Sequence, residues 1–254
     1  MNANHPPLLW IEIGDAFPDV DHAWGHDSDV PGLLCAGGDL STATLARAYG
    51  AGIFPWFNQG QPVLWWSPAP RMVLDVSAFR LHASLKKRLK QFVKSPTSEI
   101  RVDSAFDRVI HACAGNGRAG QSGTWIVPTM VQAYIRLHQA GLAHSVETWV
   151  DGELVGGLYF VALGRAVFGE SMFHHATDAS KIALAALVAM CRGFGVRHID
   201  CQQNTHHLAS MGAAEIPRAV FIDQVAKARC EASPVWSFSP VYWNGLLAST
   251  PVTT

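Results

Sequence analysis

The stretch "HIDCQ", residues 198–202, places an acid, a thiol and an amide in successive positions. If the stretch is a β-strand, neighbouring side chains point to opposite faces of its sheet. Asp200 and Gln202 then share one face, and the Cys201 thiol lies in the layer behind them. The pattern therefore favours chemistry by a carboxylate and an amide over chemistry by a cysteine nucleophile.

A second stretch, "GESMF", carries another acid in a strand-like run. The same alternation predicts that Glu170 and Met172 share one face while Ser171 points to the other. Two such strands could present Glu170, Asp200 and Gln202 to a single cleft beside an apolar wall. From the pattern alone, a buried acid with a structural role is as compatible with these residues as a catalytic one.

The histidine-rich segments do not have the spacing of a metal site. His174 and His175 are adjacent, as are His206 and His207, so neither pair directs both rings to one point from a regular helix or strand. The sequence has no His-Glu-x-x-His motif, and Cys201 has no second cysteine at ligand spacing. We expect neither a metal nor a cofactor.

The composition is typical of a globular protein with a large core. Of the 254 residues, 49% are hydrophobic and 15% are charged, and the formal net charge is −1. Any nucleic-acid contact must therefore come from a local basic patch. The five cysteines are scattered without Cys-x-x-Cys spacing, and neither a signal peptide nor an apolar run of membrane-spanning length is apparent. We expect reduced thiols, no membrane partner and a cytoplasmic location.

The chain divides into two regions that differ in residue composition and pattern. Residues 1–79 are rich in proline, glycine and tryptophan, and they predict a small loop-rich N-terminal domain. One short helix is expected there over residues 42–49, with Ser41 as its N-cap. Residues 80–254 alternate strand-like and helix-like runs and predict a mixed α/β domain.

The elements of the second region follow from hydrophobic periodicity and turn residues. Asp151-Gly152 is a hairpin signal between two strands, and Asp178 is expected to cap an alanine-rich buried helix. We expect strands over residues 100–103, 143–150, 153–163, 165–173 and 196–202, and helices over 84–94, 104–114, from 128 onward, 179–194, 204–211 and 217–232.

The first of these helices carries Lys86, Lys90 and Lys94 on one face, flanked by Lys87 and Arg88. A run of charges most often marks a solvated helix face. The same stripe could instead bind the phosphate groups of a nucleic acid.

Several sequence blocks, in the same order along the chain, cover roughly residues 31–221. They are "GGDLS", "GIFPWF", "LWWSPAPR", "GTWI", "AYIRLHQAGLAHSVE", "LVGGLY", "FGESMF", "DASKIAL" and "IDCQ". In these blocks the sequence resembles the leucyl/phenylalanyl-tRNA–protein transferase family, aminoacyl-tRNA-dependent enzymes of the bacterial N-degron pathway. The resemblance implies a small N-terminal domain joined to an acetyltransferase-like (GNAT) α/β domain with a central mixed sheet.

The resemblance also implies an activity. Leucine or phenylalanine, with methionine as a further candidate, would move from charged tRNA to the N-terminal arginine or lysine of acceptor proteins and mark them for degradation. The matching positions imply that the catalytic and amine-holding residues are Glu170, Asp200 and Gln202. They imply that donor-binding residues are Trp56 and Trp125 at the terminal adenosine, and Leu158, Phe168 and Met172 toward the amino-acid side chain. Leu158 stands where some members have methionine, a swap that conserves volume.

In this context the charge stripe is expected to contact the acceptor stem of tRNA through Lys86, Lys87, Arg88 and Lys90. The aminoacyl ester is already activated, and an α-amine has a pKa of about 8, so direct attack of the amine needs no enzyme thiol. Gln202 is too weak a base to take a proton by itself, so we expect it to orient the reactants, with Asp200 polarising it or accepting charge.

Two alternatives remain open from the sequence. One is a coenzyme-A-dependent N-acetyltransferase of the same fold, which would need a glycine-rich pyrophosphate loop where "FHHATDASK" has no glycine. The other is a non-catalytic tRNA-binding module, which would not need an acid–amide pair opposite "GESMF". The roles of His174 and His175 are open under each of these hypotheses.

Overall fold

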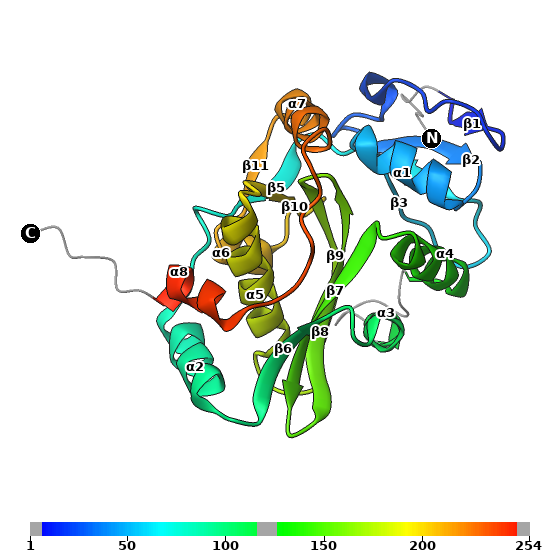
Figure 1. Ribbon diagram of the computed structural model, residues 1–254. Coiled ribbons are helices and arrows are strands. Elements are labelled where there is room, and N and C mark those ends of the chain that lie inside the picture. Colours follow the sequence, from blue (N-terminus) through cyan, green and yellow to red (C-terminus); the bar gives the residue numbers. More distant parts are fainter. Residues whose placement is uncertain (1–6, 116–125, 248–254) are drawn as a thin grey trace, which may run out of the picture.

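The computed structural model describes residues 7–115 and 126–247 (Figure 1). A sheet of the N-terminal region has four strands in the order β1-β2-β4-β3. Their bounds are Leu9–Ile11 (β1), Leu33–Gly37 (β2), Phe54–Pro55 (β3) and Leu64–Trp66 (β4). β1 is parallel to β2, and the other two pairs are antiparallel.

One helix of this region packs toward the rest of the molecule. It is α1, Thr42–Gly50, and the Ser41 hydroxyl accepts a hydrogen bond from the Thr44 amide at its N-terminus. The expected helix and its N-cap are confirmed. A 3-10 turn, η1 (Val20–His22), precedes β2.

The larger sheet has seven strands in the order β11-β5-β10-β9-β8-β7-β6. Their bounds are Arg71–Asp75 (β5), Ser98–Val102 (β6), Ala143–Val150 (β7), Glu153–Leu163 (β8), Ala166–His174 (β9), His198–Asp200 (β10) and Ala214–Ile216 (β11). β9 and β10 are parallel, whereas the other neighbours are antiparallel. The expected mixed sheet and mixed α/β class are confirmed.

The hairpin between β7 and β8 forms as the sequence predicts. Asp151 and Gly152 both have positive φ, 53° and 78°, which a two-residue hairpin turn of this kind requires. The two strands that flank the turn match the expected ranges residue for residue.

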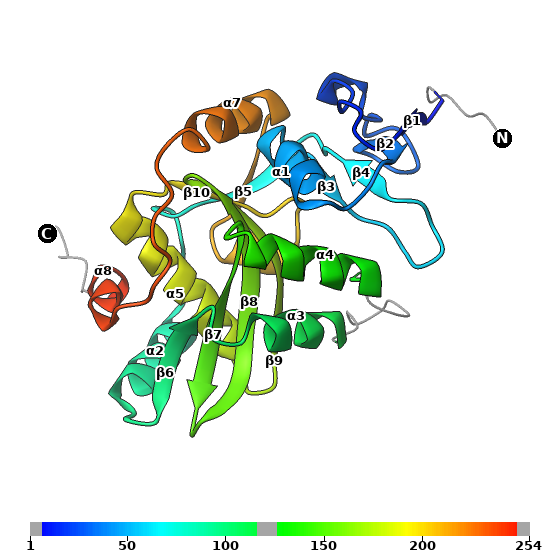
Figure 2. The same cartoon turned by 45° about the vertical axis from the view of Figure 1, so that its right-hand side comes forward.

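Helices cover both faces of the larger sheet (Figures 1 and 2). One face, here called the α4 face, is covered by α1, α3 (Phe106–Gly115) and α4 (Pro128–Gln139). The other, the α5 face, is covered by α2 (Ala83–Lys94) and α5 (Ala179–Phe194). In β8, Tyr159 contributes to the core of the α4 face and Phe160 to that of the α5 face, as strand alternation requires.

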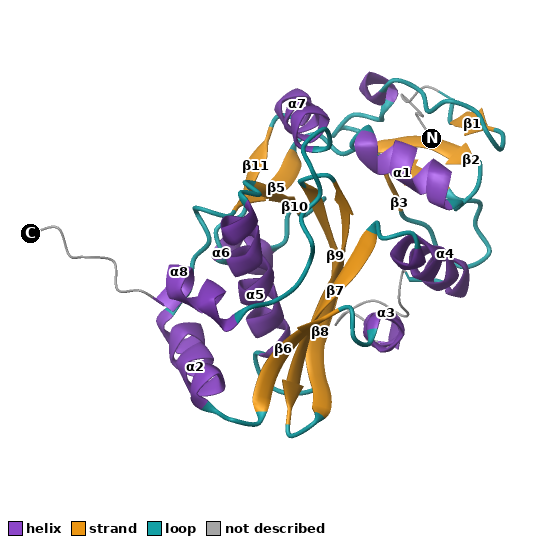
Figure 3. Cartoon of the chain, in the orientation of Figure 1, coloured by secondary structure: helices purple, strands orange, loops and turns teal. Residues whose placement is uncertain are grey.

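The remaining helices lie near the C-terminal part of the chain (Figure 3). They are α6 (His206–Ser210), α7 (Arg218–Ala228), the 3-10 turn η2 (Pro240–Trp243) and α8 (Asn244–Leu247). Within residues 7–115 and 126–247, no helix is both long and apolar enough to cross a lipid bilayer.

Two helix ends differ from expectation. Asp178 occupies the N-cap position of α5, but it has a φ of 63° and its carboxylate accepts from Lys181 Nζ at 2.8 Å rather than from a helix amide. Helix α7 ends at Ala228 rather than at Ala232, and the Ala228 carbonyl accepts a hydrogen bond from the Arg165 amide of the β8–β9 turn. A tertiary hydrogen bond thus accompanies the end of α7, whereas a local ion pair three residues apart takes the place of the expected side-chain cap of α5.

Strand β5 bears on the division into domains. It precedes the expected boundary after residue 79, yet it lies between β11 and β10 and pairs with both. We propose that the two domains divide between β4 and β5, because the hydrogen bonds of β5 commit it to the larger sheet.

Candidate active site

Strand β9 contains a β-bulge at Glu170. Ser171 pairs with Tyr159 of β8, and Gly169 pairs with the next residue of β8, Phe160, so Glu170 is an extra residue in the ladder. A bulge of this kind bends the strand and redirects a side chain. The bulge therefore decides where the Glu170 carboxylate points.

The bulge overturns one expectation from the sequence. Uninterrupted alternation predicted that Glu170 and Met172 share a face. Instead, Glu170 reaches Tyr134 of α4, whereas Met172 packs against the core of the α5 face. The prediction was wrong because an inserted residue reverses the alternation on either side of it.

Two tyrosines and an amide surround the Glu170 carboxylate. The Tyr134 hydroxyl donates to Glu170 Oε2 at 3.1 Å and is hydrogen-bonded to the hydroxyl of Tyr49, which comes from α1. Gln202 Nε2 donates to Glu170 Oε1 at 3.4 Å. Sequence reasoning missed both tyrosines as site residues, and the only available signal was a polar hydroxyl on the apolar side of α4.

Burial dominates the electrostatics of Glu170. The pKa of its carboxyl is raised from 4.5 to about 7, chiefly by loss of solvent; the charge of Asp200 adds to the rise, and that of Arg71 opposes it. Hydrogen bonds from Tyr49 and Tyr134 lower it. Burial raises the pKa of both tyrosines well above the usual value, so they stay protonated donors. A carboxyl that titrates near neutrality suits proton transfer from an amine.

Asp200 is buried and forms an ion pair with Arg71, a residue that the sequence did not mark as part of the site. Arg71 Nε and Nη2 donate to its two carboxylate oxygens, each at 2.7 Å. The relative exposure of Asp200 is 2% and that of Arg71 is 0%. Asp200 thus lies on the α4 face near Glu170, but its oxygens are engaged with protein groups rather than presented to a cleft.

Gln202 meets Glu170 by a different route from the one expected. Strand β10 ends at Asp200, and Gln202 lies beyond it with a φ of 57°. The acid–amide juxtaposition therefore forms through a turn, not through strand alternation. Cys201 behaves as predicted, since it packs against the core of the α5 face and burial raises the pKa of its thiol to about 12.

The described residues that were expected to bind the donor do not all lie on the same face of the larger sheet. Trp56 is half-buried, with its ring centroid 5.2 Å from that of Trp66. Phe168 is fully buried, and its ring centroid lies 5.0 Å from that of Tyr49. Leu158 is buried on the α5 face, which Met172 also contacts. Trp125 lies outside the described residues.

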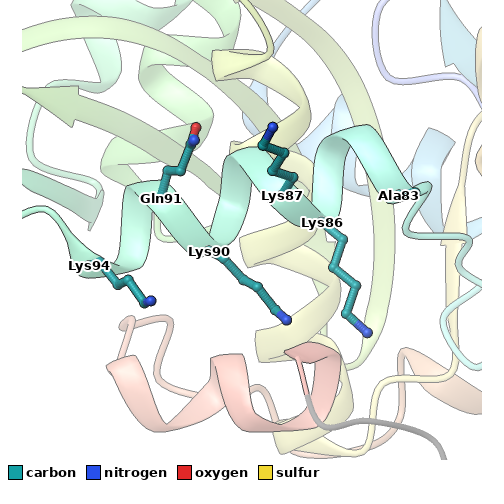
Figure 4. A pocket seen from close by; sticks show the side chains of 6 residues that line it. All are labelled: Ala83, Lys86, Lys87, Lys90, Gln91 and Lys94. Atoms are coloured by element: carbon teal, nitrogen blue, oxygen red, sulfur yellow. The ribbon is translucent and has the colours of Figure 1, made fainter.

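The expected basic helix forms as α2. Lys86, Lys87, Lys90 and Lys94 line a surface hollow of about 410 Å³ (Figure 4). Lys86, Lys90 and Lys94 extend from one side of the helix, and Lys87 from the other. Arg88 is exposed beside them. Because α2 packs on the α5 face, this basic patch and the Glu170 cluster lie on opposite faces of the sheet.

In the described part of the chain, no group of three or more histidine, cysteine, aspartate or glutamate side chains is arranged to hold a metal ion. His206 and His207 both belong to α6, and His174 ends β9. All five cysteines are free thiols.

Comparison with known proteins identifies the family. The family model described as leucyl/phenylalanyl-tRNA protein transferase matches residues 73–226, and the model of its N-terminal domain matches residues 38–69. The chain belongs to the leucyl/phenylalanyl-tRNA–protein transferase family. The resemblance seen in the sequence is confirmed.

Members of the leucyl/phenylalanyl-tRNA–protein transferase family match over nearly the whole chain. The protein of that name from Albidiferax ferrireducens is 58% identical over 254 residues, which is 100% of both chains. The one from Polaromonas sp. is 60% identical over 243 residues, 96% of this chain and 95% of that one. A solved GCN5-related N-acetyltransferase-like protein from Streptococcus suis covers 69% of this chain and 64% of its own, with 14% identity and a TM-score of 0.33.

Proposed function

We propose that this protein transfers leucine or phenylalanine from charged tRNA to the α-amine of an N-terminal arginine or lysine, which marks the acceptor protein for degradation. Membership of the family supports the donor and the type of reaction. The observation that carries the chemistry is Glu170, a carboxyl with a pKa of about 7 held between Tyr134 and Gln202.

The reaction needs one proton acceptor and no covalent enzyme intermediate. The neutral amine of the acceptor attacks the carbonyl carbon of the aminoacyl ester, and its proton passes to the Glu170 carboxylate. The tetrahedral intermediate then expels the ribose oxygen of the terminal adenosine, which takes the proton back from Glu170. A peptide bond forms, an ester bond breaks, and Glu170 returns to its starting state.

The negative charge of an ionised Glu170 also complements the positive charge of the acceptor's N-terminal residue. An N-terminal arginine or lysine brings a cationic side chain close to its own amine, and an ionised carboxylate attracts that cation. Asp200 contributes little to this attraction because Arg71 already balances its charge. Gln202 keeps its carbonyl oxygen available to orient the amine while its Nε2 donates to Glu170.

We further propose that α2 binds the acceptor stem of the donor tRNA through Lys86, Lys87, Arg88 and Lys90. Four cations on one exposed helix attract phosphates in a protein whose net charge is only −1. Trp56 and Trp125 would stack on the terminal bases, a contact worth about 1–3 kcal/mol per base. A charged-tRNA donor and five free thiols are consistent with a cytoplasmic location.

Transfer of radiolabelled leucine from Leu-tRNA to peptides tests the proposal. Peptides that start with arginine or lysine should be labelled, and the same peptides with an acetylated N-terminus should not. Acetyl-coenzyme A as donor is the control for the alternative acetyltransferase activity. Labelling from acetyl-coenzyme A alone, or tight tRNA binding without any transfer, would overturn the proposed function.

A further inference from the structure

Arg71 is held on every side in the interior of the protein. Its Nη1 donates to the Gly52 carbonyl at 3.2 Å, and its guanidinium carbon lies 4.9 Å from the ring centroid of Phe54 and 4.5 Å from that of Phe221. The other two nitrogens bind Asp200. Few side chains other than arginine can stack on two rings and form a paired bond to a carboxylate at once.

Asp200 in turn fixes the backbone that follows it. Its Oδ1 accepts a hydrogen bond from the Gln202 amide at 3.0 Å, and the Gln202 carbonyl accepts one from the Met72 amide at 3.3 Å. These bonds hold Gln202 at a φ of 57°, a left-handed conformation that is unfavourable for a residue other than glycine. A local turn of aspartate to the amide two residues on is thus tied to a buried arginine.

The Gln202 turn decides whether its side chain meets Glu170. Strand β10 ends at Asp200, so the position of the Gln202 side chain depends on this turn, from which Nε2 lies 3.4 Å from Glu170 Oε1. The contacts therefore run in sequence from Arg71 through Asp200 and Gln202 to the carboxylate that titrates near neutrality.

We propose that Arg71 is a positioning residue for the transfer reaction: through its paired bond to Asp200 it fixes the Gln202 turn against Glu170. In this arrangement Asp200 supports the turn and does not accept the amine's proton. The inference rests on the proposed function, since it assigns parts within that same site.

A double-mutant cycle tests the inference. Removing one partner of a buried ion pair leaves an uncompensated charge, whereas removing both does not. Asp200→Asn keeps an oxygen for the Gln202 amide but leaves Arg71 unpaired, so we expect kcat to fall about a hundredfold. Arg71→Gln combined with Asp200→Asn should recover kcat to within about tenfold of the wild type. The pH dependence of the double variant should keep its rise near pH 7, because the lost charges of Asp200 and Arg71 act on the Glu170 pKa in opposite directions and burial, the largest cause, remains.

A conservative variant covers the case in which the other variants do not fold. Arg71→Lys keeps the charge but cannot form the paired bond, so kcat should fall at least about tenfold while the KM for Leu-tRNA stays the same. The exposed pair of Arg165 and Glu231, replaced by Gln singly and together, should show no such coupling.

Three results separate the possible failures. A folded double variant that is as inactive as Asp200→Asn would show that the Asp200 charge itself is required, and would overturn the inference. Wild-type kcat in Arg71→Lys would also overturn it. Absence of leucine transfer by the wild-type protein would instead refute the proposed function.

Discussion

Replacing Glu170 by glutamine should make the protein less active and more stable at alkaline pH. Glu170 has a pKa of about 7 in the folded protein, against 4.5 for the free side chain, chiefly because it is buried. The folded state therefore binds more protons than the unfolded state between these two values, and the free energy of unfolding of the wild type falls as pH rises through this window. Glutamine has no charge to bury and removes this loss.

The magnitude follows from the two pKa values. At about 1.4 kcal/mol per tenfold change, a rise from 4.5 to about 7 corresponds to about 3 kcal/mol. We expect Glu170→Gln to exceed the wild type in unfolding free energy by about 1 kcal/mol at pH 5 and by about 3 kcal/mol at pH 8. For a chain of this length, the difference at pH 8 corresponds to roughly 6–12 °C in Tm.

Denaturant unfolding of both proteins at several pH values between 5 and 8 measures this difference. Glu153→Gln is a matched control, because Glu153 is exposed at the start of β8. Leucine transfer by Glu170→Gln should fall by about 10² to 10⁴ in kcat, since the proton acceptor is lost. A stability difference that is the same at pH 5 and pH 8 would refute the raised pKa, and wild-type kcat would refute the role of Glu170 in proton transfer.

Three further changes test other parts of the site. Tyr134→Phe removes a hydrogen-bond donor to the Glu170 carboxylate, and such a bond to a charged group is worth about 1.5 kcal/mol. The pKa of Glu170, and with it the midpoint of the rise of kcat/KM with pH, should therefore increase by about one unit. The control variant Tyr242→Phe should leave this midpoint unchanged. Cys201→Ala should retain most transfer activity, and mass spectrometry should find no aminoacylated Cys201; a trapped thioester would contradict direct attack by the amine. Alanine at Lys86, Lys87, Arg88 and Lys90 of α2 should raise the KM for Leu-tRNA and leave reaction with an aminoacyl-adenosine donor unchanged. The salt dependence of this KM should fall by about one unit of slope for each phosphate that is no longer neutralised. The control variant carries alanine at four other cations: Arg101, Arg108, Arg165 and Lys227. Equal losses of activity with both donors, or the same rise in KM in the control variant, would contradict tRNA binding by α2.

Local periodicity determined much of the fold from the sequence alone. Strands β7 and β8, the buried helix α5 and the basic face of α2 all lie where the spacing of apolar and charged residues placed them. The opposite-face position of Cys201 was also predicted, because alternation holds across the short strand β10 and the residue that follows it. These features depend on residues a few positions apart, which the sequence shows directly.

The tertiary structure decided the geometry of the candidate site. The bulge at Glu170 depends on how β9 pairs with β8, and no residue type in "GESMF" predicts it. Arg71 and Asp200 are 129 positions apart, and only the pairing of β5 with β10 brings them together.

The pKa of Glu170 has the same origin. It is raised because helices from two regions of the chain, α1 and α4, bury the carboxyl behind Tyr49 and Tyr134. A sequence shows which groups can titrate, but desolvation depends on what surrounds each group after folding. The sequence alone therefore determined which residues could do the chemistry, whereas long-range packing decided which of them is poised to do it.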